Sequence, residues 1–67
     1  MRFNDVFKMW RLGLGLTQKE AAELLGICRG TYNRFEKTGL VGELTLYKLQ
    51  QYYNNNRKEF NEGEANV

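Results

Sequence analysis

The sequence predicts an all-α domain of four to five short helices. Its apolar residues recur three and four positions apart, as in amphipathic helices, and no segment shows the alternation typical of a half-buried strand. Glycines separate the periodic segments, and the chain contains no proline. A chain of 67 residues has the size of one small domain. We expect residues 1–60 to form this domain and residues 61–67 to be a flexible tail.

The first helix is predicted over residues 2–13. Gly13 and Gly15 are expected to end it, and Leu14 between them is available for packing. Four apolar residues at positions i, i+3, i+4 and i+7 would lie along one side of this helix: Phe3, Val6, Phe7 and Trp10.

A second helix is predicted from Thr17 to Leu25. The Thr17 hydroxyl and the Glu20 carboxylate form the pattern of a capping box, which satisfies free N–H groups at a helix start. Gly26 is expected to end the helix in the left-handed conformation that glycine tolerates best.

Two further helices are predicted, over about residues 29–37 and 43–53, with a loop at residues 38–42. Tyr32 and Phe35 are three residues apart and would form the buried side of the earlier helix. The buried side of the later helix would consist of Leu46, Leu49 and Tyr53.

The composition argues against several classes of function. The chain has one cysteine and no histidine, so neither an intrachain disulfide nor a metal site is expected. No apolar run is long enough to cross a membrane, and the N-terminus does not resemble a signal peptide, so we expect a cytoplasmic protein. Without histidine, paired carboxylates or a glycine-rich phosphate loop, we expect no enzyme, no cofactor and no small-molecule ligand.

Basic residues concentrate in the first part of the chain, although the net charge is only +2. Residues 1–38 contain seven Lys or Arg and four Asp or Glu, a balance of +3, whereas residues 39–67 contain three and four, a balance of −1. Solvated surface charge is the plain explanation, and a small phosphate-binding surface is the alternative.

The predicted helix at residues 29–37 has a polar face opposite Tyr32 and Phe35. Arg makes paired hydrogen bonds with guanine and Asn with adenine, so side chains of these types can read bases. Taken alone, the charges favour an ordinary solvated face. The residues on this face are Arg29, Gly30, Asn33, Arg34 and Lys37.

The segment LTQKEAAELLGICRGTYNRFE, residues 16–36, resembles the Cro/C1-type (XRE-like) helix-turn-helix family of phage repressors and bacterial regulators. The resemblance covers about residues 5–53 and implies a compact lambda-repressor-like fold. It would make the chain a small phage-type transcriptional regulator. The matching positions are Leu16, Thr17, Gln18, Ala22, Leu25, Gly26, Ile27, Thr31, Tyr32, Phe35 and Glu36.

Three residues depart from the family pattern. Cys28 stands where a Ser or Thr usually caps the next helix, and a thiol is a weaker acceptor, so we expect a poorer cap. Gly30 replaces a residue that in the family frequently touches bases; with Thr31, it would allow a close approach to DNA. Leu24 is apolar where the family is often polar, so it would pack beneath aromatic residues or face a partner.

The resemblance implies that the helix at residues 29–37 enters the major groove of double-stranded DNA. Base reading then falls to Arg29, Asn33 and Arg34. Residues at the ends of the two helices are expected to bind phosphates: Thr17, Gln18, Lys19, Lys37 and Thr38.

Two structural expectations accompany this assignment. Arg11 and Glu36 match positions that form an ion pair in the family. Tyr52, Tyr53 and Phe60 are expected to form a homodimer contact, with completion of the monomer core as the alternative. A homodimer would bind a palindromic operator and block transcription, and its own operon is one candidate target.

A protein-interaction or adaptor module is the alternative function. The aromatic residues Tyr47, Tyr52 and Phe60 could serve such a role if they were exposed. An adaptor has no need to gather basic and amide side chains on one helix face, so the sequence favours DNA binding.

Overall fold

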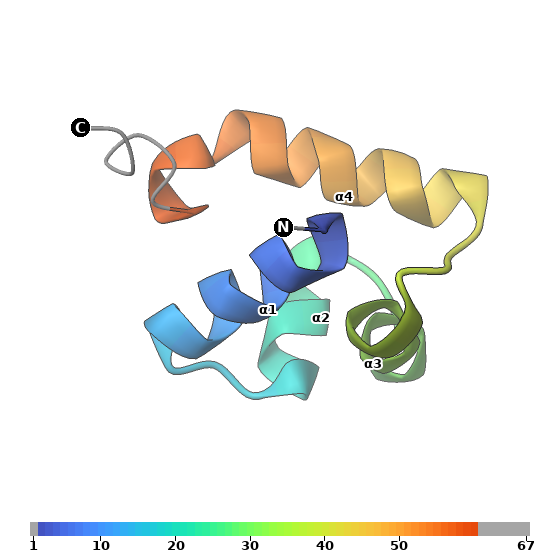
Figure 1. Cartoon of the computed structure of the whole chain (residues 1–67), viewed down its shortest axis with the longest axis horizontal. Coiled ribbons are helices and arrows are strands. Elements are labelled where there is room, and N and C mark those ends of the chain that lie inside the picture. The colour runs from blue at the N-terminus through green and yellow to red at the C-terminus, as the bar shows by residue number, and fades with distance from the viewer. Residues whose placement is uncertain (1, 61–67) are drawn as a thin grey trace.

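The computed structural model describes residues 2–60, which form four α-helices and a final 3₁₀ helix, with no strand in this range. The all-α prediction is therefore confirmed. One helix, α4, lies along one side of the other three (Figure 1). The elements are α1 (Phe3–Leu14), α2 (Gln18–Leu25), α3 (Arg29–Thr38), α4 (Glu43–Asn55) and η1 (Arg57–Phe60).

Left-handed glycines end the first three helices. Gly15, Gly26 and Gly39 have φ angles of 72°, 75° and 79°, and the N–H of each donates back to a carbonyl of its helix. Gly13, by contrast, lies inside α1, so only one of the two predicted terminators acts. The three glycines turn the chain sharply, which allows short helices to pack at steep angles to one another.

The predicted capping box begins α2. The Thr17 hydroxyl accepts from the Glu20 amide at 3.1 Å, and the Glu20 carboxylate accepts from the Thr17 amide at 2.8 Å. The start of α3 has no such support, because the Cys28 side chain makes no capping hydrogen bond, in line with the sequence prediction. The first turn of α2 is therefore stabilised by a capping box, whereas the first turn of α3 has no side-chain cap.

The core is largely aromatic. Phe7 lies at its centre, edge-on to the rings of Trp10 and Phe35, an arrangement that aromatic pairs favour. Residues from all four α-helices and η1 contribute to the buried core: Phe7, Trp10, Ala21, Ala22, Leu25, Tyr32, Phe35, Leu49 and Phe60. Partly buried side chains pack around it: Phe3, Val6, Leu16, Ile27, Val41, Tyr52 and Tyr53.

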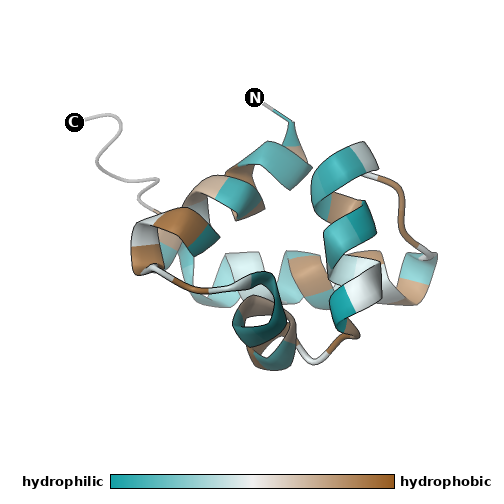
Figure 2. Cartoon of the chain, turned by 90° about the horizontal axis from the view of Figure 1, so that it is seen from below, coloured by the Kyte–Doolittle hydropathy of each residue, from teal (hydrophilic) through white to brown (hydrophobic). Residues whose placement is uncertain are grey.

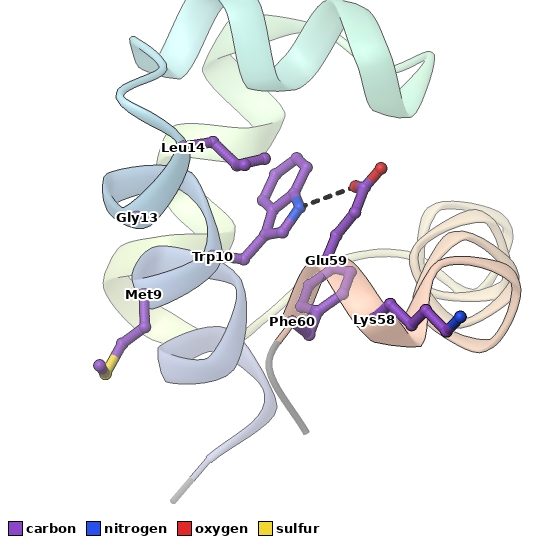
Figure 3. A pocket seen from close by; sticks show the side chains of 7 residues that line it. All are labelled: Met9, Trp10, Gly13, Leu14, Lys58, Glu59 and Phe60. Atoms are coloured by element: carbon purple, nitrogen blue, oxygen red, sulfur yellow. Dashed lines mark hydrogen bonds between the residues drawn. The ribbon is translucent and has the colours of Figure 1, made fainter. Parts of the chain in front are cut away.

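The end of the described chain folds back onto α1 and α4. Phe60 is 7% exposed and stacks on Trp10, with ring centroids 5.2 Å apart. Glu59 accepts a hydrogen bond from the Trp10 indole at 3.1 Å (Figure 3) and another from the Tyr52 hydroxyl at 2.9 Å. Burial and this bond raise the pKa of Tyr52 to about 12. A hollow of about 390 Å³ remains beside the stack, between α1 and η1.

This arrangement corrects the sequence expectation for Phe60. The 3₁₀ turn after Asn56 directs Phe60 into the core, so its ring is not free to contact a second chain. Tyr52 and Tyr53 are half-buried against the same cluster. Phe60 therefore completes the monomer core, the alternative weighed for these residues, whereas a homodimer contact of the half-buried Tyr52 and Tyr53 stays a prediction.

The structure also differs from the sequence expectations for Leu14, Leu24 and the end of α4. Leu24 is 53% exposed and does not pack beneath the aromatic residues, and Leu14 is also largely exposed. The helix predicted to end near residue 53 continues to Asn55. The expected tail, residues 61–67, lies outside the described residues. None of the helices in residues 2–60 is long and apolar enough to cross a membrane.

Candidate nucleic-acid interface

An ion pair beneath the surface joins α1 to the end of α3. Arg11 Nε lies 2.7 Å from Glu36 Oε2, and Arg11 Nη2 lies 3.2 Å from Glu36 Oε1. A third contact, from Arg11 Nη1 to the Leu16 carbonyl at 3.0 Å, also fixes the chain that enters α2. The buried Asn4 amide donates to the Glu36 carbonyl at 3.1 Å, so two α1 side chains hold the same residue of α3.

The Glu36 carboxylate is kept charged by its neighbours. Burial alone would raise its pKa, but hydrogen bonds from Arg11 and Gln18 outweigh that effect and hold the pKa below its ordinary value. The hydrogen bond with Glu36 likewise raises the pKa of Arg11. This fixed negative charge lies at the inner end of a hydrogen-bonded chain that leads to the surface.

Gln18 connects this charge to α3. Its Nε2 donates to Glu36 Oε1 at 3.1 Å, and its Oε1 accepts from Asn33 Nδ2 at 2.7 Å. Asn33 and Glu36 are three residues apart, so they lie on one side of α3 and both can meet the first residue of α2. The chain of contacts therefore fixes how the start of α2 lies against the middle of α3.

A hollow of about 460 Å³ opens between the start of α2 and the first half of α3. Gly30 lies at its edge, and a Cβ atom built there would meet nothing within 4 Å. In the view from below, α3 is seen lengthwise and is mainly hydrophilic (Figure 2). Six of the residues singled out from the sequence line this hollow: Thr17, Gln18, Lys19, Arg29, Gly30 and Asn33.

The other predicted contact residues lie outside this hollow. Arg34 and Lys37 are exposed farther along α3. The Thr38 hydroxyl donates to the Arg34 carbonyl at 2.9 Å and accepts from the Leu40 amide at 3.1 Å, so its one hydrogen is already used within the protein. Thr31 is half-buried and lines a second hollow, beside the turn between α2 and α3.

Sequence reasoning missed Lys48 at this second hollow. Its ammonium group, carried by α4, donates to the Gly26 carbonyl at 3.2 Å, where the negative end of the α2 dipole lies. The spacing of residues along α4 holds no signal for this contact, because it depends on how α4 crosses the end of α2. No cluster of His, Cys, Asp or Glu in residues 2–60 could bind a metal ion.

This geometry suits a double helix. The residues that line the hollow bring the N-terminal end of α2 close to the positive charge of Arg29 on α3, and groups of both kinds bind phosphates. The major groove is about 12 Å wide and admits one α-helix. A helix held by its neighbour at a fixed angle, with arginine and amide side chains on its outer face, can reach base edges there.

Comparison with known proteins also indicates DNA binding. A sequence model of the helix-turn-helix family matches residues 7–60, which is most of the chain. No curated protein and no solved structure is similar enough to match. The match begins within α1 and runs through α2, α3 and α4 to the end of η1, as expected for a lambda-repressor-like fold. The chain therefore belongs to the Cro/C1-type helix-turn-helix family of DNA-binding transcriptional regulators.

Proposed function

We propose that this regulator is a phage-type repressor that binds a palindromic operator as a homodimer. The outer face of α3 enters the major groove, and the bound protein blocks transcription by occupying the site. The observation that carries this proposal is the hollow lined by Gln18, Arg29 and Asn33, where hydrogen-bonding and basic groups from two helices meet.

Contacts divide into those that read bases and those that hold the backbone. Arg29, Asn33 and Arg34 read bases, and the open space at Gly30 lets the helix approach them closely. The remaining residues at the helix ends hold phosphates: Thr17, Gln18, Lys19 and Lys37. Thr38 shapes the loop through the two hydrogen bonds of its hydroxyl.

The homodimer contact is proposed on the first half of α4 and the preceding loop. Leu40, Leu44 and Tyr47 are 70%, 70% and 59% exposed, which is costly for apolar side chains gathered in one segment. This segment directly follows α3, so two copies that meet there would place their α3 helices side by side along one face of DNA. Half-sites one helical turn apart would then be occupied together.

The test begins with selection of bound sequences from a pool of random duplexes, followed by footprinting of DNA upstream of the protein's own gene. A palindromic sequence recovered in both experiments supports repression of its own operon. The double variant Arg29→Ala/Arg34→Ala is the matched control, because it should fold normally and lose selectivity. Recovery of no preferred sequence, with binding that is equally weak for parent and variant, would overturn the proposal in favour of an adaptor role.

A further inference from the structure

The hydrogen bonds around Gln18 have a fixed direction. A carboxylate that remains charged can only accept hydrogen bonds, and Arg11 keeps Glu36 in that form. Gln18 must therefore turn its NH₂ group toward Glu36, as the 3.1 Å contact has it. The Gln18 carbonyl oxygen then points toward α3.

The orientation of the Gln18 amide also fixes the orientation of the Asn33 side-chain amide. The Gln18 oxygen is an acceptor, so Asn33 must offer its NH₂ group there, at 2.7 Å. Turning the Asn33 amide over would bring two carbonyl oxygens together at that distance. The buried ion pair thus determines which end of the Asn33 amide faces Gln18 and which end remains for another partner.

We propose that Gln18 is a positioning residue that makes Asn33 select adenine, an inference that rests on the proposed function. Within residues 2–60, the hydrogen bond to Gln18 is the one recorded for the Asn33 side chain. One N–H and the carbonyl oxygen of the amide are left over. Adenine presents a complementary pair in the major groove, the N6 amino donor and the N7 acceptor.

Guanine is disfavoured by the same arrangement. Its O6 and N7 atoms are both acceptors, so a bound Asn33 would have to offer two donors in place of one donor and one acceptor. An unrestrained asparagine could rotate its NH₂ group toward O6 and recover part of the contact. The hydrogen bond that Asn33 donates to Gln18 opposes this rotation, so Gln18 contributes to base selectivity without touching a base.

This role differs from phosphate binding, although Gln18 can have both. Its Nε2 keeps a second hydrogen beyond the one given to Glu36, and that hydrogen remains for a phosphate oxygen. A phosphate contact affects all sequences alike. A positioning contact affects only the base that Asn33 faces, which provides the means of separating the two roles.

The experiment compares Gln18→Met, which keeps the length of the side chain but forms neither bond, with Lys19→Met as the matched control. Affinities are measured for operator variants that carry each base at each position of a half-site, and Asn33→Ala identifies the position that Asn33 reads. We expect adenine at that position, and a fall of about five-fold in the adenine-to-guanine affinity ratio for Gln18→Met. Lys19→Met should lower all affinities by similar factors and leave the ratio unchanged.

A measurement without DNA separates the two proposals. In the free protein, NMR should show a protected Asn33 side-chain NH₂ group whose signal changes in Gln18→Met and persists in Lys19→Met. Selective DNA binding with an unchanged adenine-to-guanine ratio in Gln18→Met would overturn this inference alone. A protected Asn33 amide in a protein that selects no DNA sequence would overturn the proposed function, and with it the role in base selection.

Discussion

Arg11 binds both carboxylate oxygens of Glu36, with Nε 2.7 Å from Oε2 and Nη2 3.2 Å from Oε1. The two side chains are only 13% and 5% exposed, so the pair lies largely out of water. Removal of either partner would leave a buried charge without compensation, which is the main energetic consequence of such a pair.

Replacement of Arg11 by Met should strongly destabilise the domain. The loss of one partner from a buried ion pair costs about 3–5 kcal/mol, a large share of the stability of a domain this small. Urea unfolding followed by circular dichroism measures the free energy of unfolding. Arg34→Met is the matched control, because Arg34 is exposed and should change stability little. An Arg11→Met variant as stable as the parent would show that the pair contributes nothing.

Acid should weaken the fold through Glu36. The pKa of this carboxyl is lower in the folded chain than its ordinary value of 4.5, so its stabilising contribution is complete above that value. The contribution is lost as the pH falls from 4.5 toward the lowered pKa. Urea unfolding at several pH values should show this loss for the parent. The free energy of unfolding should fall less steeply with decreasing pH in Glu36→Gln than in the parent. An equal pH dependence in the two proteins would contradict a stabilising role of the charged Glu36.

Lys37→Ala should weaken binding to every DNA sequence by a similar factor. A lysine that neutralises one phosphate releases about one counterion, so the slope of log affinity against log salt should fall by about one. Titrations at several salt concentrations measure the slope. Lys58→Ala is the control, since Lys58 belongs to η1, which lies at the opposite side of the molecule from α3 (Figure 1). A changed base preference in Lys37→Ala would mean that Lys37 reads bases.

Arg29→Ala and Arg34→Ala should each relax base preference at one position per half-site. A bidentate contact to guanine is worth about 1–3 kcal/mol of discrimination, and both side chains are exposed, so folding should be unaffected. Binding to operators with single-base changes gives the preferences. Lys8→Ala is the control, because it removes an exposed charge from α1 and should leave the base preferences unchanged. Full retention of preference in both arginine variants would show that α3 does not read the operator.

Leu44→Glu should prevent assembly of two chains on one operator. The added charge lies on the apolar segment proposed as the dimer contact, where burial without a partner is unfavourable. Light scattering of the protein with a palindromic duplex measures the number of chains bound. Leu12→Glu makes the same change at a 58% exposed position of α1 and should bind as the parent does. One parent chain per duplex at saturation would exclude the dimer.

Much of the fold could be predicted from local sequence patterns. The capping box at Thr17 and the left-handed Gly26 depend on neighbouring residues only, and the structure contains both. Tyr32 and Phe35 were predicted to be buried from their spacing, and both are. The positions of Arg11 and Glu36 were paired on the family resemblance, because 25 residues of chain separate them.

Contacts that depend on the angles between helices could not be predicted. The bond from Asn33 to Gln18 requires α2 and α3 to cross at one particular place, and no spacing within either helix indicates it. The buried Asn4 was missed for the same reason, since its partner is the main chain of Glu36. Phe60 was misjudged because the surrounding residues are polar, and one apolar residue gives no periodic signal.

The stacking of Trp10 against Phe60 also provides a spectroscopic reporter. Trp10 is the only tryptophan in the chain, so indole fluorescence would come from one known place. Release of residues 57–60 would expose the indole to water and break its bond to Glu59, which should shift the emission to longer wavelength. The hollow between α2 and α3 is lined by other residues, so the same signal should respond little when DNA binds there. A single fluorophore would thus follow the opening of the last turn separately from operator binding.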